Sequence, residues 1–183
     1  MLDSFLATLD KYAEIYPEET ETVDRVRHLV QTYPDAFYRT CRIGHITGSA
    51  WIVSADRQRY LLTHHRKLDR WLQLGGHADG EQAMQRVALR EAQEESGMAD
   101  FKFVEIKGQV LPFDIDIHPI PARGAEPAHA HYDLRYLLIA GPGQTLALSD
   151  ESKDLRWFTA TGVLKVAGEE SIFRMLRKAK IFL

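Results

Sequence analysis

The sequence has few of the features that mark secreted, membrane-spanning or nucleic-acid-binding proteins. Only one of its 183 residues is a cysteine, Cys41, which excludes an internal disulfide and a cluster of metal-binding thiolates. No apolar run approaches the roughly 18 residues that a membrane helix requires, and no basic segment opens the chain as in a signal peptide. The 23 basic residues do not exceed the 26 acidic ones, whereas a nucleic-acid-binding surface is usually basic. We therefore expect a cytoplasmic protein that binds neither a nucleic-acid polymer nor a membrane.

Hydrophobic periodicity divides the chain into an N-terminal helical extension, residues 1–36, and a larger domain, residues 37–183. The extension holds eight acidic and three basic residues, and its apolar residues recur at helical spacing. The larger domain alternates strand-like stretches with one well-marked helix, which predicts an α/β/α sandwich with a mixed sheet. The expected helices are 2–16, 23–30, 81–96 and 170–179, the expected strands are 45–54, 59–64, 101–110 and 131–140, and loops are expected at 71–80, 119–127 and ahead of Trp157.

The helix expected at residues 81–96 carries an unusual charge pattern. When it is projected at 100° per residue, its apolar residues mark one packed side, and Glu91, Glu94 and Glu95 fall on that side. Crowded, half-buried carboxylates repel one another and lose hydration. Arg90 can reach Glu94 one turn on, but a single guanidinium cannot neutralise three acids. Because Mg²⁺ is commonly held by carboxylates together with substrate phosphates, the pattern indicates an Mg²⁺ or Mn²⁺ site for phosphate chemistry; a solvated acidic helix face is the alternative.

The residues around this helix resemble the Nudix box. That pattern is Gly, five residues, Glu, seven residues, and then Arg-Glu-apolar-x-Glu-Glu-x-Gly-apolar. Here it runs from Gly76 to Gln82 and, after seven residues, from Arg90 to Met98. The second half agrees at every specified position, but Gln82 stands where the box has Glu, which leaves Glu81 or Asp79 as candidates for that role. The resemblance implies a Nudix-like fold and a metal-dependent hydrolase that cleaves a diphosphate linkage in a nucleoside diphosphate joined to another group.

The resemblance also implies roles for single residues. The implied ligands of Mg²⁺ or Mn²⁺ are Glu91, Glu94, Glu95 and the carbonyl oxygen of Gly75. Arg90 is expected to orient the glutamates. Glu151 is expected to lie on a loop six residues before Trp157, as a further metal ligand or as the general base, and a solvated loop carboxylate is the alternative reading.

The chain also contains eight histidines, several of them close together in the sequence. The residues expected to contact the substrate are His65, Arg66, His77 and His131. His129, His131 and Asp133 alternate, so their side chains share one face of a strand. Binding of a transition metal such as zinc by this group is one alternative, and a plain pocket wall is another.

Two rival functions fit part of the pattern. One is isomerisation of a prenyl diphosphate, although no cysteine lies near the box. The other is a non-catalytic Nudix-like sensor that binds a nucleotide, which the intact glutamates disfavour. The expected partner is a small-molecule nucleotide whose identity the sequence does not specify, and a homodimer is one option for the oligomeric state.

Overall fold

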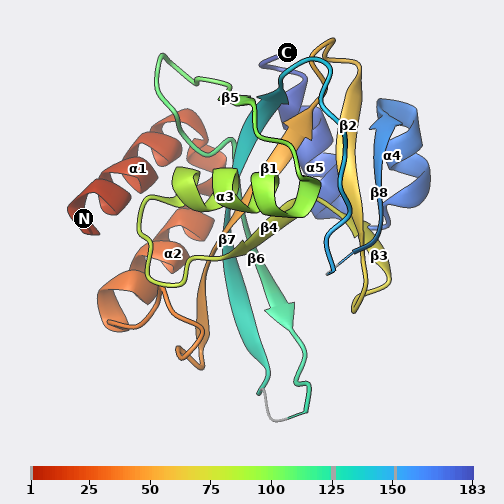
Figure 1. Ribbon diagram of the computed structural model, residues 1–183. Coiled ribbons are helices and arrows are strands. Elements are labelled where there is room, and N and C mark those ends of the chain that lie inside the picture. Colours follow the sequence, from red (N-terminus) through yellow and green to blue (C-terminus); the bar gives the residue numbers. More distant parts are fainter. Residues whose placement is uncertain (1, 125–126, 151) are drawn as a thin grey trace.

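The structure is a computed structural model that describes residues 2–124, 127–150 and 152–183. The described residues form a mixed eight-stranded sheet with helices on both faces (Figure 1). The strands are β1 (Gly44–Val53), β2 (Arg59–His65), β3 (Arg70–Leu72), β4 (Leu74–His77), β5 (Phe101–Phe103), β6 (Asp114–Ile120), β7 (His129–Ala140) and β8 (Ser152–Thr159). The helices are α1 (Leu2–Ile15), α2 (Thr20–Thr32), α3 (Met84–Ser96), α4 (Ala160–Val166) and α5 (Glu170–Ala179), with a 3-10 turn at Pro17–Glu19. The expected α/β architecture with two N-terminal helices is confirmed.

The centre of the sheet is the parallel pair β1 and β7, which stay in register from Gly44 opposite Ala130 to Val53 opposite Ile139. The strand order is β3-β2-β1-β7-β5, while β4, β6 and β8 pair antiparallel with β1, β7 and β2. Every residue of β1 is buried. That burial explains its run of small and apolar residues, because a central strand is covered on both faces.

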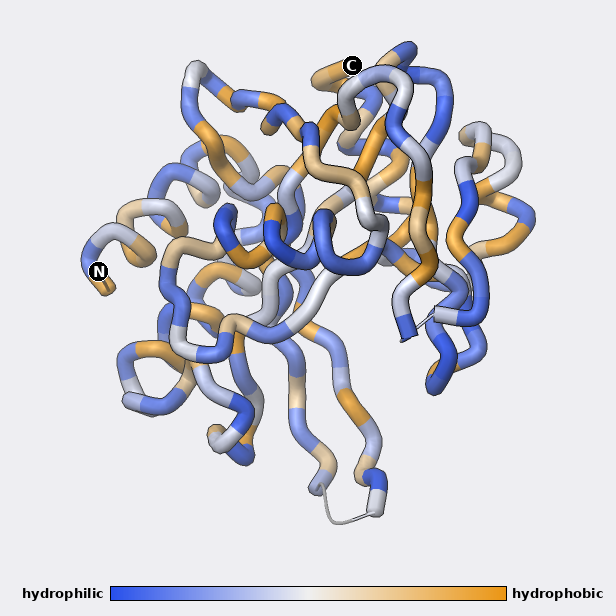
Figure 2. The backbone as a smooth tube through the Cα atoms, viewed as in Figure 1, coloured by the Kyte–Doolittle hydropathy of each residue, from blue (hydrophilic) through white to orange (hydrophobic). Residues whose placement is uncertain are grey.

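The two faces of β1 belong to two different cores. Ile46 and Ala50 point into a core shared with α1, α2 and α3, whereas Trp51 and Val53 point into a second core with α5. Alternate residues of a strand point to opposite faces. The polar residues of β1 therefore lie on the same face as Trp51, but nearer the start of the strand: His45, Thr47 and Ser49. The lower end of β7, which pairs with them, is also hydrophilic (Figure 2).

Several expected boundaries differ from the structure. Helix α3 begins at Met84 rather than at residue 81, and the strand expected at 101–110 ends at Phe103. Four strands, β3, β4, β6 and β8, occupy stretches that were expected wholly or partly as loops. β3 and β4 are too short and too rich in glycine to show a period of two. The sequence of β6 is Asp-Ile-Asp-Ile-His-Pro-Ile. Its aspartates are more typical of a loop, but in the structure Arg135 and Arg174 neutralise them.

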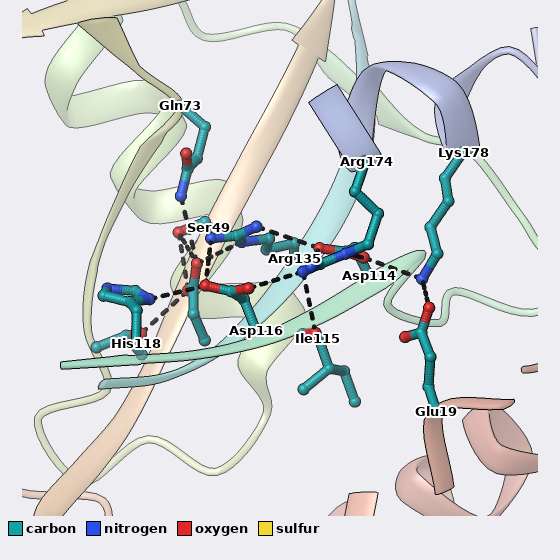
Figure 3. Close-up of polar contacts among 12 residues, drawn as sticks. Glu19, Ser49, Gln73, Asp114, Ile115, Asp116, His118, Arg135, Arg174 and Lys178 are labelled. Carbon is teal, nitrogen blue, oxygen red and sulfur yellow. Dashed lines mark hydrogen bonds and ion pairs between the residues drawn. The ribbon is translucent and has the colours of Figure 1, made fainter. Parts of the chain in front are cut away.

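The N-terminal helices are tied to the sheet by a buried polar network (Figure 3). Lys178 of α5 contacts Glu19 at 2.5 Å and Asp114 of β6 at 2.9 Å. Arg135, at the centre of β7, pairs with the same Asp114 and is 2% exposed. The extension therefore shares both a hydrophobic core and an ionic network with the sheet. None of the helices in the described ranges is long and apolar enough to cross a bilayer.

Candidate active site

Helix α3 crosses β1 and β4 (Figure 1). Two of its glutamates contact the glycine pair of β4. Glu95 is 8% exposed and the Glu91 side chain 15% exposed, but the Glu94 side chain is 64% exposed. The expectation that all three acids face the interior is therefore wrong for Glu94. In projection, Glu94 lies at the edge of the packed arc. The helix ends at Gly97, whose φ of 70° is left-handed, as glycine readily allows.

The two covered carboxylates lie directly against the backbone of β4. The Gly75 N–H donates a hydrogen bond of 2.8 Å to Oε1 of Glu95. A Cβ atom added to Gly76 would lie 2.5 Å from a Glu91 carboxylate oxygen, and one added to Gly75 would lie 2.2 Å from Oγ of Ser49. The two consecutive glycines allow β4 to approach α3 and β1 closely, because any side chain there would displace the Glu91 carboxylate or Ser49 of β1.

Arg90 links this strand to the helix. Its guanidinium donates to the His77 carbonyl oxygen at 2.7 Å and to Oε1 of Glu91 at 2.8 Å, and its Nε lies 4.0 Å from a Glu94 oxygen. The hydrogen bond to Glu91 raises the pKa of Arg90 despite partial burial. The position of Glu91 is thus set by a permanent positive charge that is itself anchored to β4.

A cleft of about 270 Å³ opens beside these groups. Its wall brings together residues from the loop before β1 and from β1, β2, β4, α3, β6 and β7. The lining residues include Arg39, His65, Lys67, His77, Glu91 and His131. Cations and acids from distant parts of the chain therefore share one concave surface, as expected of a site for a small anionic ligand.

Three of the four residues expected to contact substrate line this cleft: His65, His77 and His131. Arg66 is placed differently, since its guanidinium donates to the carbonyl oxygens of Asp150 and Ser152, at 2.9 Å each. Its neighbour Lys67 lines the cleft instead. Glu151 lies outside the described residues.

The three residues at the start of the box have other neighbours. Oε1 of Glu81 accepts a hydrogen bond of 2.8 Å from the Ala83 N–H, just ahead of α3. Gln82 borders a separate pocket against α1. Asp79 forms a two-point ion pair with Arg39, at 3.0 Å for each contact, and this pairing lowers the pKa of Asp79.

Arg39 was not predicted from the sequence, and of the polar wall behind the histidines only Asp133 was, as a neighbour of His129 and His131 on one strand face. Arg39 lies in an irregular segment that shows neither periodicity nor a motif. Asp133 is 2% exposed and accepts hydrogen bonds from Thr47 at 3.0 Å and Ser49 at 2.8 Å, while Arg135 donates to it at 2.8 Å. The alternation of polar residues along two paired strands was the available signal for this wall.

Carboxylates on one helix thus lie against a glycine pair beside a cleft with basic residues, the arrangement of an enzyme site for an anionic substrate. The NUDIX domain model matches residues 45–179, and the chain belongs to the Nudix family of acid anhydride hydrolases. The resemblance found in the sequence is thereby confirmed. No match to a curated protein was found.

Three solved structures with the same fold are distant from this chain in sequence. A NUDIX-family hydrolase from Clostridium perfringens is 22% identical, with a TM-score of 0.60 over 76% of this chain and 98% of its own. The dihydroneopterin triphosphate pyrophosphohydrolase of E. coli is 15% identical, with a TM-score of 0.59 over 74% and 94%. The NUDIX domain of Shewanella oneidensis NrtR, complexed with ADP-ribose, is 16% identical, with a TM-score of 0.52 over 85% and 96%. At these identities the likeness establishes the fold alone.

Proposed function

We propose that this protein hydrolyses a diphosphate linkage in a nucleoside diphosphate joined to another group, using Mg²⁺ or Mn²⁺. The observation that carries the proposal is the seating of Glu91 and Glu95 against Gly75 and Gly76 at the edge of the cleft. Carboxylates at one end of an anion-sized cleft are better suited to bind a metal ion than to bind the substrate directly, since the carboxylates and the substrate phosphates both carry negative charge.

The donor set at this edge fits a hard divalent cation. Glu91, Glu94 and Glu95 would hold the ion together with the Gly75 carbonyl, all through oxygen atoms, which Mg²⁺ and Mn²⁺ prefer. When bound, the ion polarises phosphoryl oxygens and lowers the pKa of its water. Arg90 keeps Glu91 aligned through its bonds to that carboxylate and to β4. Glu151 remains our candidate for a further ligand or general base.

The cleft supplies the means to orient a diphosphate. Arg39 and Lys67 carry positive charge on its wall, and His65 and His77 add ring nitrogens. A guanidinium binds phosphate oxygens in pairs and an ammonium binds them as a point charge. We propose that these groups hold the phosphates while the group beyond the diphosphate extends along the cleft. The partner is thus a small molecule, in a cytoplasmic protein for which a homodimer remains one option.

The rival functions have less support from the structure. The single cysteine, Cys41, is buried and does not belong to the described wall of the cleft, which disfavours the isomerase. A non-catalytic sensor has no need of the carboxylates that here approach the backbone of β4, and their presence disfavours that function too.

A substrate screen with product analysis tests the proposal. The panel should include ADP-ribose, nucleotide sugars, dinucleoside polyphosphates, nucleoside triphosphates and a prenyl diphosphate, each with Mg²⁺ and with Mn²⁺. We expect at least one compound to be split at its diphosphate, giving a phosphomonoester that mass spectrometry identifies. Tight binding without turnover of any compound would favour the sensor, and isomerised prenyl diphosphate would favour the isomerase; either outcome contradicts the proposal.

A further inference from the structure

Three histidines from three different strands place their rings together beside the cleft. They are His45 of β1, His77 of β4 and His131 of β7. Their ligand nitrogens all lie within 4.8 Å of one another. The ring centroids are 5.0 Å apart for His45 and His77, 4.9 Å for His45 and His131, and 5.1 Å for His77 and His131.

The register of the sheet fixes this arrangement. His45 pairs directly with His131 across the parallel strands, and His77 pairs with Thr47, which is two residues along β1 on the same face as His45. Side chains paired in this way across strands are neighbours by geometry. The cluster is therefore held by the most regular part of the fold and does not depend on a loop.

We propose that His45, His77 and His131 bind a transition-metal ion such as Zn²⁺, at a site chemically separate from the glutamates. Imidazole nitrogens suit Zn²⁺, Ni²⁺ and Cu²⁺, whereas Mg²⁺ requires oxygen donors. Three histidines leave one coordination position open, as in zinc sites that bind a water or a substrate. His77 and His131 also line the cleft, so an ion held by the three rings would lie at its wall.

The spacing of the nitrogens is compatible with a bound ion after a small closure of the rings. Zn–N bonds of about 2.1 Å in a tetrahedral site hold the nitrogens about 3.4 Å apart. The separations of up to 4.8 Å must therefore shrink by at most about 1.4 Å. Small rotations of the side chains supply this movement, because the torsion next to an imidazole ring is broad.

Two further histidines surround the three. His129 stacks on His45 with centroids 4.9 Å apart, and His118 lies 5.5 Å from His131. Asp133 lies on the same face of β7 as His131 and is held by Thr47 and Ser49. An ion held by the three rings would therefore lie among further histidines.

Titration of the full-length protein with Co²⁺ and Zn²⁺ tests the proposal. The chelator-treated protein is titrated in excess Mg²⁺, so that the glutamate site is occupied by the hard cation. We expect about one Zn²⁺ per chain by equilibrium dialysis, and visible absorption typical of tetrahedral Co²⁺ with nitrogen ligands. Failure of the wild-type protein to bind either ion under these conditions would overturn the proposal; the histidines would then be a wall for substrate contact.

Matched variants locate the ion. His77→Gln and His131→Gln each remove one half-buried ligand and should weaken Zn²⁺ binding at least about tenfold, with folding checked by circular dichroism. His28→Gln, on the exposed side of α2, should leave affinity unchanged. Glu95→Gln should also retain Zn²⁺. Equal affinity in the cluster variants, or loss confined to Glu95→Gln, would contradict the site. Zn²⁺ binding without hydrolysis of any substrate would overturn only the proposed function.

Discussion

Glu95 and Glu81 both belong to the region of the Nudix box, yet their carboxylates have different hydrogen-bond partners. Glu95 accepts a hydrogen bond from Gly75 beside the cleft, whereas Glu81 accepts one from Ala83 ahead of α3. Glu95→Gln keeps the shape of the side chain but removes a charge that the ion needs, so kcat should fall by several orders of magnitude. Glu81→Gln should cost less than about tenfold, because an amide oxygen can still accept that hydrogen bond. Steady-state kinetics at saturating Mg²⁺ decide this, and equal losses would mean that Glu81 fills the metal-binding role vacated by Gln82.

The glycine pair allows a second prediction at the scale of single residues. In Gly76→Ala the new methyl group would meet the Glu91 carboxylate at about 2.5 Å, so the acid must move. We expect kcat to fall at least about tenfold, since catalytic groups must be held within a fraction of an ångström. Gly168→Ala is the control, because nothing lies within 4 Å of its added Cβ. Wild-type kcat in folded Gly76→Ala would show that Glu91 is not held in place by β4.

At the scale of elements, one tyrosine hydroxyl helps to hold the N-terminal helices against the sheet. Oη of Tyr12 accepts from the Ile115 N–H at 3.1 Å and from Lys178 at 2.9 Å, and it donates to Glu19. Tyr12→Phe leaves these buried groups without that partner and should lower the free energy of unfolding by about 1–3 kcal/mol. Tyr38→Phe, at an exposed ring, should change it by less than about 0.5 kcal/mol. Urea unfolding measures both, and equal stabilities would show that the network does not fasten the helices.

Elements with a strong period were predictable from the sequence, and elements stabilised by distant partners were not. The apolar spacing of α1 and the buried run of β1 identify them without tertiary information. β6 could not be recognised, because its aspartates become compatible with a strand only beside Arg135 and Arg174.

The candidate site follows the same division. The box placed Glu91 and Glu95 correctly beside the glycines, since motif and helix period agree there. Glu94 is exposed at the edge of the packed face of α3, and the place of Arg39 depends on an irregular segment. Neither feature can be recognised in a single sequence. The cluster of five histidines, which are His45, His77, His118, His129 and His131, was predicted only in part, from the alternation of His129 and His131 in β7.

At the scale of the whole molecule, the buried ionic network should control acid stability. Asp116 faces Arg135 of β7, Arg174 of α5 and His118 of its own strand. Burial alone would raise its pKa, but the hydrogen bond with His118 and the two guanidinium groups lower it. The unfolded chain therefore binds more protons below about pH 4, and this contribution to stability is lost as the pH falls through the folded-state pKa.

Comparison of the wild type with Asp116→Asn checks that contribution. Above about pH 4 the variant should be less stable by about 2 kcal/mol, because it leaves a buried charge with one partner fewer. Below that pH the difference should shrink, because the unfolded wild-type chain binds a proton at Asp116 that the folded carboxylate does not yet bind. Asp10→Asn, in an exposed pair with Arg27, should differ from the wild type by less than about 0.5 kcal/mol. A difference for Asp116→Asn that stays constant from pH 7 to pH 3 would contradict the assigned pKa shift.

Metal-dependent turnover tests the account most directly. The best substrate of the screen is given to chelator-treated protein, and Mg²⁺ or Mn²⁺ is then added back in steps, with wild type and Glu95→Gln measured side by side. We expect no hydrolysis in excess chelator, full recovery in the wild type on addition of the ion, and almost none in Glu95→Gln. The ion should also stabilise the wild-type fold, by about 2.7 kcal/mol at a hundredfold excess over its dissociation constant. Full turnover in excess chelator would contradict the assignment of the glutamates as a metal site.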